Sequence, residues 1–171
     1  MAGKATGGGG PQTKNLEGHV LIVEARFYED IADQMAAGAV AVLEAHGCTW
    51  ERVAVPGALE ISQVLSAAIE AGRFEPFAED DAKSFEGVIA IGCVVRGETY
   101  HFEIVCNNAN HWLMEVASLE GVPVGNAILT VDTMAQAEER AKGGAAGKGG
   151  DAARACLRLI EVRRSFAPAD L

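Results

Sequence analysis

Apolar and β-branched residues gather in four short runs, each closed by glycine or by polar residues. Runs of this length that are rich in valine and isoleucine are typical of strands buried on both faces. They predict strands over residues 19–24, 49–55 and 87–91, and a last strand that follows 121–124 and ends at residue 130.

Between the strands, apolar residues recur three or four positions apart, which is the period of a helix with one buried face. Helices are predicted over residues 30–46, 58–71, 102–118, 134–141 and 151–166. Strand and helix thus alternate, and connections of this length join parallel strands. We expect a flavodoxin-like, three-layer α/β/α sandwich whose four-stranded, mainly parallel sheet is flanked by helices.

Three segments lack any such period. Residues 1–16 are glycine-rich and carry too little apolar surface to order themselves, which predicts a flexible N-terminal tail before one domain over 17–168. Residues 73–84 are acidic and contain a proline, so they are predicted to be a surface loop. Residues 142–150 are rich in glycine and predict a linker between the last two helices.

The composition narrows the possible partners. A length of 171 residues suits one domain with a single core, and a formal net charge of −10 disfavours nucleic acid and anionic membranes. No apolar run approaches the length of a membrane span. The four cysteines lie far apart without a C-x-x-C pair, which indicates reduced thiols in a cytoplasmic protein. No spacing of cysteine and histidine indicates a metal site.

Residue types that bind ligands or transfer protons are most concentrated in residues 92–101, between the third strand and its helix. Their sequence is Gly-Cys-Val-Val-Arg-Gly-Glu-Thr-Tyr-His. Such a junction presents free amides and the positive end of a helix dipole, which together favour an anion. Thr99 adds a hydroxyl, Arg96 a fixed cation and His101 a titratable imidazole. These groups suit a phosphate-bearing substrate whose reaction moves protons, although a histidine here can also simply cap its helix.

The carboxyl ends of the other strands meet at the same edge of a parallel sheet. Phe27 follows the first strand, where it is either a core residue or a face on which a flat heterocycle stacks. Glu60 is either a partner of its helix dipole or a ligand contact, and the amides of Ala58 and Leu59 beside it can pair with a ring edge. The first strand is not followed by G-x-G-x-x-G, which disfavours NAD.

Taken together, these segments resemble the lumazine synthase family over about residues 20–163. The matching segments are 26–28 (family R-F-N), 55–60 (V-P-G-A-F/L-E), 92–101 (G-x-V-I-R-G-x-T-x-H), 136–140 (within E-Q-A-x-x-R-A) and 147–149 (N-K-G). Any one of these motifs is short, but five of them in the same order are highly specific.

The resemblance implies an enzyme of riboflavin biosynthesis that condenses 5-amino-6-(D-ribitylamino)uracil with 3,4-dihydroxy-2-butanone 4-phosphate to give 6,7-dimethyl-8-ribityllumazine, phosphate and water. It implies no cofactor and no metal, with His101 as the catalytic proton shuttle, Phe27 stacked on the pyrimidine and Arg140 on the phosphate. Further substrate contacts are implied for Ala58, Leu59, Glu60, Cys93, Val94, Val95, Glu98, Thr99, Asn126 and Lys148. The family forms pentamers, or multiples of pentamers, with sites between adjacent subunits, so a homo-oligomer is expected.

The chain departs from the family pattern at three positions. Asn126 stands where a phenylalanine often reaches a neighbouring subunit's site, Tyr28 where asparagine is usual, and Ser62 where proline is common. Two other functions stay open, namely a module that binds a lumazine or flavin without turnover and a shell-forming paralogue. A proton shuttle at His101 beside a phosphate ligand at Arg140 favours the enzyme, because a pure binder needs no shuttle.

Overall fold

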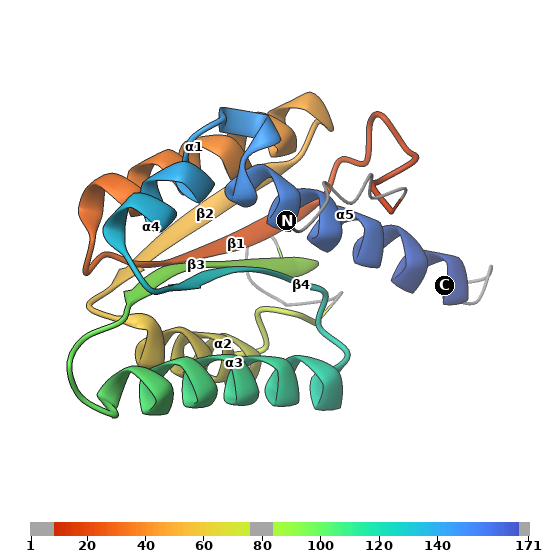
Figure 1. Cartoon of the computed structure of the whole chain (residues 1–171). Coiled ribbons are helices and arrows are strands. Elements are labelled where there is room, and N and C mark those ends of the chain that lie inside the picture. The colour runs from red at the N-terminus through yellow and green to blue at the C-terminus, as the bar shows by residue number, and fades with distance from the viewer. Residues whose placement is uncertain (1–8, 76–83, 168–171) are drawn as a thin grey trace.

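A sheet of four parallel strands forms the centre of the fold (Figure 1). The strands are β1 (His19–Ala25), β2 (Thr49–Val55), β3 (Gly87–Val95) and β4 (Val124–Val131). Their order across the sheet is β2-β1-β3-β4, and every neighbouring pair is parallel. All four carboxyl ends therefore open at one edge, where a sheet of this kind binds its ligands.

Helices cover both faces of the sheet, which confirms the predicted three-layer sandwich (Figure 1). One layer holds α1 (Glu29–Ala45), α4 (Met134–Ala141) and α5 (Lys148–Phe166), and the other holds η1 (Ala58–Glu60), α2 (Ile61–Glu70) and α3 (His101–Glu120). This computed structural model describes residues 9–75 and 84–167, so most of the loop predicted over 73–84 lies outside it. None of the helices within those ranges is both long and apolar enough to span a bilayer.

The expectation of a single core is wrong, because the sheet separates two hydrophobic clusters and successive side chains of β1 enter them in turn. Val20 and Ile22 pack in the cluster beneath α1 and α5, while Leu21 and Val23 pack in the cluster beneath α2 and α3. All four side chains are at most 2% exposed, which confirms the prediction of a strand buried on both faces. Burial of each such side chain stabilises the fold by about 1.5–3 kcal/mol.

The third strand is longer than its sequence predicts. Its predicted end at residue 91 is wrong, because Gly92 to Val95 pair with Ile128 to Val131 of β4. Gly92 is buried inside the strand and is not the start of a turn. The connection that leads to α3 is therefore restricted to residues 96–100.

The prediction of a linker over residues 142–150 is also wrong. A short 3-10 helix, η2 (Gly144–Ala146), and the first turn of α5 occupy this segment. A Cβ atom on Gly149 would collide with the carbonyl oxygen of Met35 in α1, and one on Gly150 would collide with that of Ala145. Glycine is thus required here because the backbones approach closely.

Part of the predicted tail is attached to the domain. The amides of Gln12 and Thr13 donate to the Glu161 carboxylate of α5 at 3.0 and 2.6 Å, and the Leu16 side chain is 4% exposed in the core. Burial alone would raise the pKa of the Glu161 carboxyl, but hydrogen bonds from Thr13 and Gln12 bring it down to about 2. Residues 1–8 of the predicted tail lie outside the described residues.

Candidate active site

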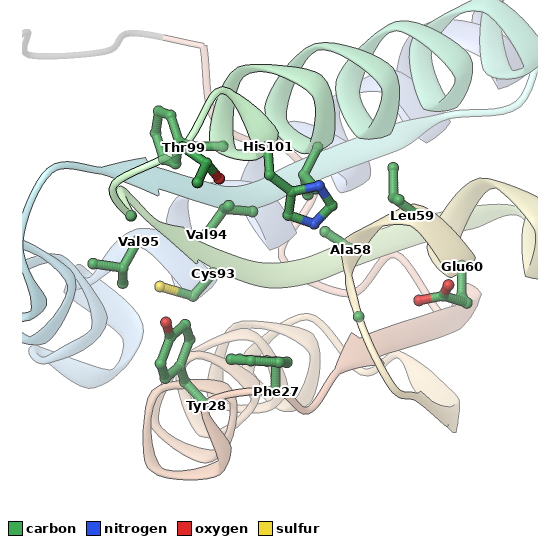
Figure 2. Close-up of a pocket in the computed structure, with 14 residues that line it drawn as sticks. Phe27, Tyr28, Ala58, Leu59, Glu60, Cys93, Val94, Val95, Thr99 and His101 are labelled. Carbon is green, nitrogen blue, oxygen red and sulfur yellow. The ribbon is translucent and has the colours of Figure 1, made fainter.

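A pocket of about 290 Å³ opens at the carboxyl ends of β1, β2 and β3 (Figure 2). Its volume lies near the lower limit for small-molecule sites, and its place is where an open α/β sheet usually binds ligands. Most of the candidate residues named from the sequence line it: Phe27, Ala58, Leu59, Glu60, Cys93, Val94, Val95, Thr99 and His101. The fold thus gathers side chains that are scattered through the sequence.

Two adjacent aromatic residues form one side of the pocket where β1 ends. The Phe27 side chain is 72% exposed, and its ring meets that of Tyr28 edge-on, with centroids 5.0 Å apart and planes at 73°. The preceding Arg26 is held by ion pairs to Glu24 at 3.2 Å and Asp33 at 2.8 Å. Phe27 is therefore not a core residue but an aromatic face presented at a fixed strand end.

A second side of the pocket is built by η1, which follows β2. Gly57 precedes this short helix in an extended conformation, and Ala58 is 6% exposed against the core. Amides in the first turn of a helix have no partner within it, so those of Ala58 and Leu59 can meet the polar edge of a ligand. The carboxyl group of Glu60 lies at the same end of the pocket (Figure 2).

His101, the first residue of α3, lies across the pocket from Phe27 (Figure 2). Its side chain is exposed, and no described residue forms a hydrogen bond with either ring nitrogen. Thr99 lines the same wall two residues earlier. An imidazole without competing partners can exchange protons with a ligand, and the adjoining helix N-terminus favours an anion.

Arg96 does not line this pocket, although the sequence suggested it as a cation for the substrate. Its Nε donates to Asp132 at 2.7 Å, another guanidinium nitrogen donates to Glu103, and the group lies 4.2 Å from the Phe102 ring centroid. The hydrogen bonds to Asp132 and then Glu103 raise the pKa of the Arg96 guanidinium. Arg96 thus ties the loop before His101 to β4 and to α3.

Cys93 contributes apolar surface to the pocket. Burial raises the pKa of the Cys93 thiol to about 11, so it stays protonated near neutral pH and is a poor nucleophile. Within residues 9–75 and 84–167, no group of three or more His, Cys, Asp or Glu side chains could hold a metal ion.

Two of the remaining candidate residues lie near α3 but outside the pocket. Glu98 is exposed in the loop before that helix and does not line the cavity. Asn126 lies near the amino end of β4, away from the ligand edge, and its side-chain amide donates to Asn110 of α3 at 2.8 Å. One chain alone therefore does not bring Asn126 to the pocket.

The two candidate cations lie in the other helical layer. Arg140 of α4 is exposed and donates to the carbonyl oxygen of Gln136 at 3.1 Å, and Lys148 at the start of α5 pairs with Asp151 at 3.2 Å. No arginine or lysine lines the pocket among the described residues, whereas Glu60 does. A dianionic ligand would therefore find no fixed cation there within one chain.

The pocket also includes residues that the sequence did not single out as contacts: Tyr28, Gly57, Gly97, Phe102 and Val105. The pair Phe27 and Tyr28 at a strand end was a usable signal, because one aromatic ring commonly orients another. The apolar spacing of the helix predicted over 102–118 places Phe102 and Val105 on its buried face, but both are only partly buried. Their turn of α3 extends past the sheet to form the pocket wall.

A family profile and individual relatives that match this sequence all carry the same description. A sequence profile of the family described as 6,7-dimethyl-8-ribityllumazine synthase matches residues 17–164. A protein of that name from Azorhizobium caulinodans is 51% identical over 145 residues, or 85% of this chain and 86% of the relative. Relatives of the same name from Nitrobacter hamburgensis and Agrobacterium fabrum are 48% and 45% identical, covering 87% and 86% of this chain and 88% and 96% of their own.

Proposed function

Because the chain belongs to the 6,7-dimethyl-8-ribityllumazine synthase family, we propose that the pocket between Phe27 and His101 is its active site. The chain is a transferase of riboflavin biosynthesis that condenses 5-amino-6-(D-ribitylamino)uracil with 3,4-dihydroxy-2-butanone 4-phosphate. The observation that carries the site assignment is the placement of an open aromatic face opposite an imidazole that has no hydrogen-bond partner among residues 9–75 and 84–167 (Figure 2).

The pyrimidine stacks on the exposed ring of Phe27 in this proposal. The amides of Ala58 and Leu59 meet its polar edge, and the ribityl chain extends toward Glu60. The backbone of Cys93, Val94 and Val95 closes the opposite side. Holding two small reactants in this orientation supplies much of the rate, because it replaces a bimolecular encounter with a step inside one complex.

His101 moves the protons in each step. The substrate amine attacks the ketone and loses water to give an imine, after which removal of a proton allows phosphate to leave. The second ring then closes with loss of water. The His101 imidazole is free to accept and return these protons, a role worth about 10²- to 10⁴-fold in rate. Thr99 and the first amides of α3 receive the phosphate.

A second copy of the chain completes the site. The phosphate is a dianion, yet the lining residues of one chain include no arginine or lysine. Arg140 is exposed on α4 and, among the residues that the structure describes, its guanidinium bonds only to the carbonyl of Gln136, so it can face a neighbour. Asn126 and Lys148 also lie outside the pocket of their own chain. We therefore propose a homo-oligomer, and the family resemblance suggests a pentamer or a multiple of pentamers; the widely separated cysteines support a cytoplasmic location.

The test is to mix both substrates with the purified protein and to follow lumazine absorbance together with phosphate release. Lumazine and phosphate should form at equal rates, without added metal or cofactor. His101→Ala should lower kcat by about 10²- to 10⁴-fold without abolishing turnover.

His111→Ala is the matched control. This histidine is also exposed on α3 but pairs with Glu115 outside the pocket. Loss of rate in His111→Ala and none in His101→Ala would exclude the assignment. Absence of any lumazine from the wild-type protein would exclude the proposed activity itself.

A further inference from the structure

Tyr28 separates two hollows of the surface. It lines the active-site pocket, and it also lines a hollow between α1 and α4 that includes Ile31 and Met134. The residue begins α1 as its N-cap, and its ring packs with Val95 against the core cluster beneath α1 and α5. The ring is therefore a fixed wall of the pocket and not a loose surface group.

The ring of Tyr28 also holds Phe27 in place. Phe27 is 72% exposed, and the edge-on contact at 5.0 Å is the aromatic contact that restrains its ring. An edge-to-face pair keeps one ring face open while fixing the tilt of that ring. Asparagine, the family residue at this position, is too short to make this contact.

The hydroxyl of Tyr28 has no hydrogen-bond partner among the residues that the structure describes. Figure 2 shows it on the side of Cys93 and Val95, whereas Glu60 lies at the other end of the pocket. A phenol can both donate and accept, and a polar group left unpaired when a ligand covers it is costly. A ligand that fills this pocket should therefore offer it a polar atom.

From this geometry we propose that Tyr28 is a specificity-determining residue for the pyrimidine substrate. Its ring fixes the orientation in which Phe27 stacks, and its hydroxyl hydrogen-bonds the carbonyl or N–H edge of the heterocycle. This rests on the proposed function, which places the ribityl chain toward Glu60 and so leaves the opposite ring edge beside Tyr28. The other side chains at that end, Cys93, Val94 and Val95, offer the ring only a weakly polar thiol and apolar groups.

The test compares wild type, Tyr28→Phe and Tyr28→Ala with two unreactive analogues that lack the 5-amino group, 6-(D-ribitylamino)uracil and 6-(methylamino)uracil. Inhibition constants are measured for both, together with kcat and the KM of each substrate. Tyr28→Phe should weaken both analogues by the same factor, about three- to tenfold, and leave the KM of the sugar phosphate unchanged. Tyr28→Ala should weaken both further, because the edge contact to Phe27 is lost as well.

Tyr100→Phe is the control, since Tyr100 is the other tyrosine of the chain, is 70% exposed and does not line the pocket. Unchanged inhibition constants in Tyr28→Phe would overturn the proposal, as would a loss confined to the ribityl analogue, which would place the hydroxyl on the sugar chain. A wild-type protein that forms no lumazine would instead overturn the proposed function. Tyr28→Phe retains the ring, so its melting temperature should match that of wild type and exclude misfolding as the cause.

Discussion

Replacement of Arg96 by alanine should slow catalysis far more than it destabilises the fold. The guanidinium joins Asp132 after β4, Glu103 in the first turn of α3 and the face of Phe102. The backbone amide of Arg96 also donates to the carbonyl oxygen of Val131 at 2.9 Å. These contacts fix both ends of residues 96–100, and His101 begins the helix that follows.

The solvent exposure of Arg96 and its partners determines how much stability Arg96→Ala should lose. The side chains of Arg96 and Asp132 are 46% and 63% exposed, so water screens their attraction and little stability depends on it. The effect on the position of His101 is larger, because a shift of a catalytic group by about 1 Å costs about 10²-fold in rate. We expect kcat to fall about 10- to 100-fold in Arg96→Ala, less than in His101→Ala, with only a small change in melting temperature.

The assay is steady-state kinetics combined with thermal melting. Arg96→Lys should recover part of kcat, because a point charge can pair with Asp132 or Glu103 but cannot span both. Arg154→Ala is the control, since Arg154 also makes two hydrogen bonds, to Asp151 at 2.6 Å and to Ala145 at 2.7 Å, away from the pocket. If Arg96→Ala kept kcat within about threefold of wild type, or if Arg154→Ala lost as much, positioning of His101 by this loop would be refuted.

Four further outcomes are expected. Phe27→Ala should raise the KM of the pyrimidine while kcat changes little, because stacking stabilises ground and transition states alike; a fall confined to kcat would contradict this. Arg140→Ala should raise the KM of the sugar phosphate about 10- to 150-fold, with partial recovery in Arg140→Lys, and an effect on the pyrimidine alone would reverse the assigned orientation. The pKa of Glu161 is about 2 in the folded protein against an ordinary 4.5, so its stabilising effect is complete above pH 4.5 and is lost as the pH falls toward 2. The melting temperatures of wild type and Glu161→Gln should therefore converge as the pH falls from 4.5 toward 2. A difference that stays constant would argue against the link between Glu161 and residues 12 and 13. Turnover should survive a chelator, and restoration of a chelated enzyme by one specific metal would show that a metal is required.

The helices and strands were predictable because the spacing of apolar residues in each one follows from which of its faces is buried. Val20 to Val23 are apolar without alternation, and the structure buries them in two different cores. The spacing of Met35, Ala39 and Leu43 likewise predicted a helix with one buried face, and all three are fully buried in α1. Alternation of such elements then leaves few arrangements besides a parallel sheet between helices.

The errors arose where a glycine serves a distant contact. The sequence predicts a turn from Gly92 on, but the strand continues because β4 pairs with it up to Val95. The composition around Gly149 and Gly150 predicts a linker, yet these glycines allow α5 to approach α1 and η2. Local composition cannot distinguish a glycine needed for a turn from one needed for close packing, since the contacting backbone lies far away in the sequence.

Candidate residues at strand ends were predictable for a geometric reason. Phe27, Ala58 and His101 follow three different strands, and parallel strands bring their carboxyl ends to one edge. The same reasoning does not reach Arg140 or Lys148, which belong to helices of the opposite layer. The sequence marks Tyr28 as a departure from the family pattern, but its place in the pocket wall follows only from the fold, which packs its ring against Phe27 and the core beneath α1.

The separation of charge within one chain bears on how the proposed enzyme works. A net charge of −10 repels a phosphate dianion at long range, so binding needs a local cation. Arg96 is the arginine closest in sequence to His101, but Asp132 and Glu103 already neutralise it. Two arrangements then fit the proposed site: the phosphate meets the amides of α3 alone, or it also meets the exposed Arg140 of another copy. The second arrangement adds a charge-assisted, bidentate contact that the first lacks, and it makes the complete site a property of the assembly.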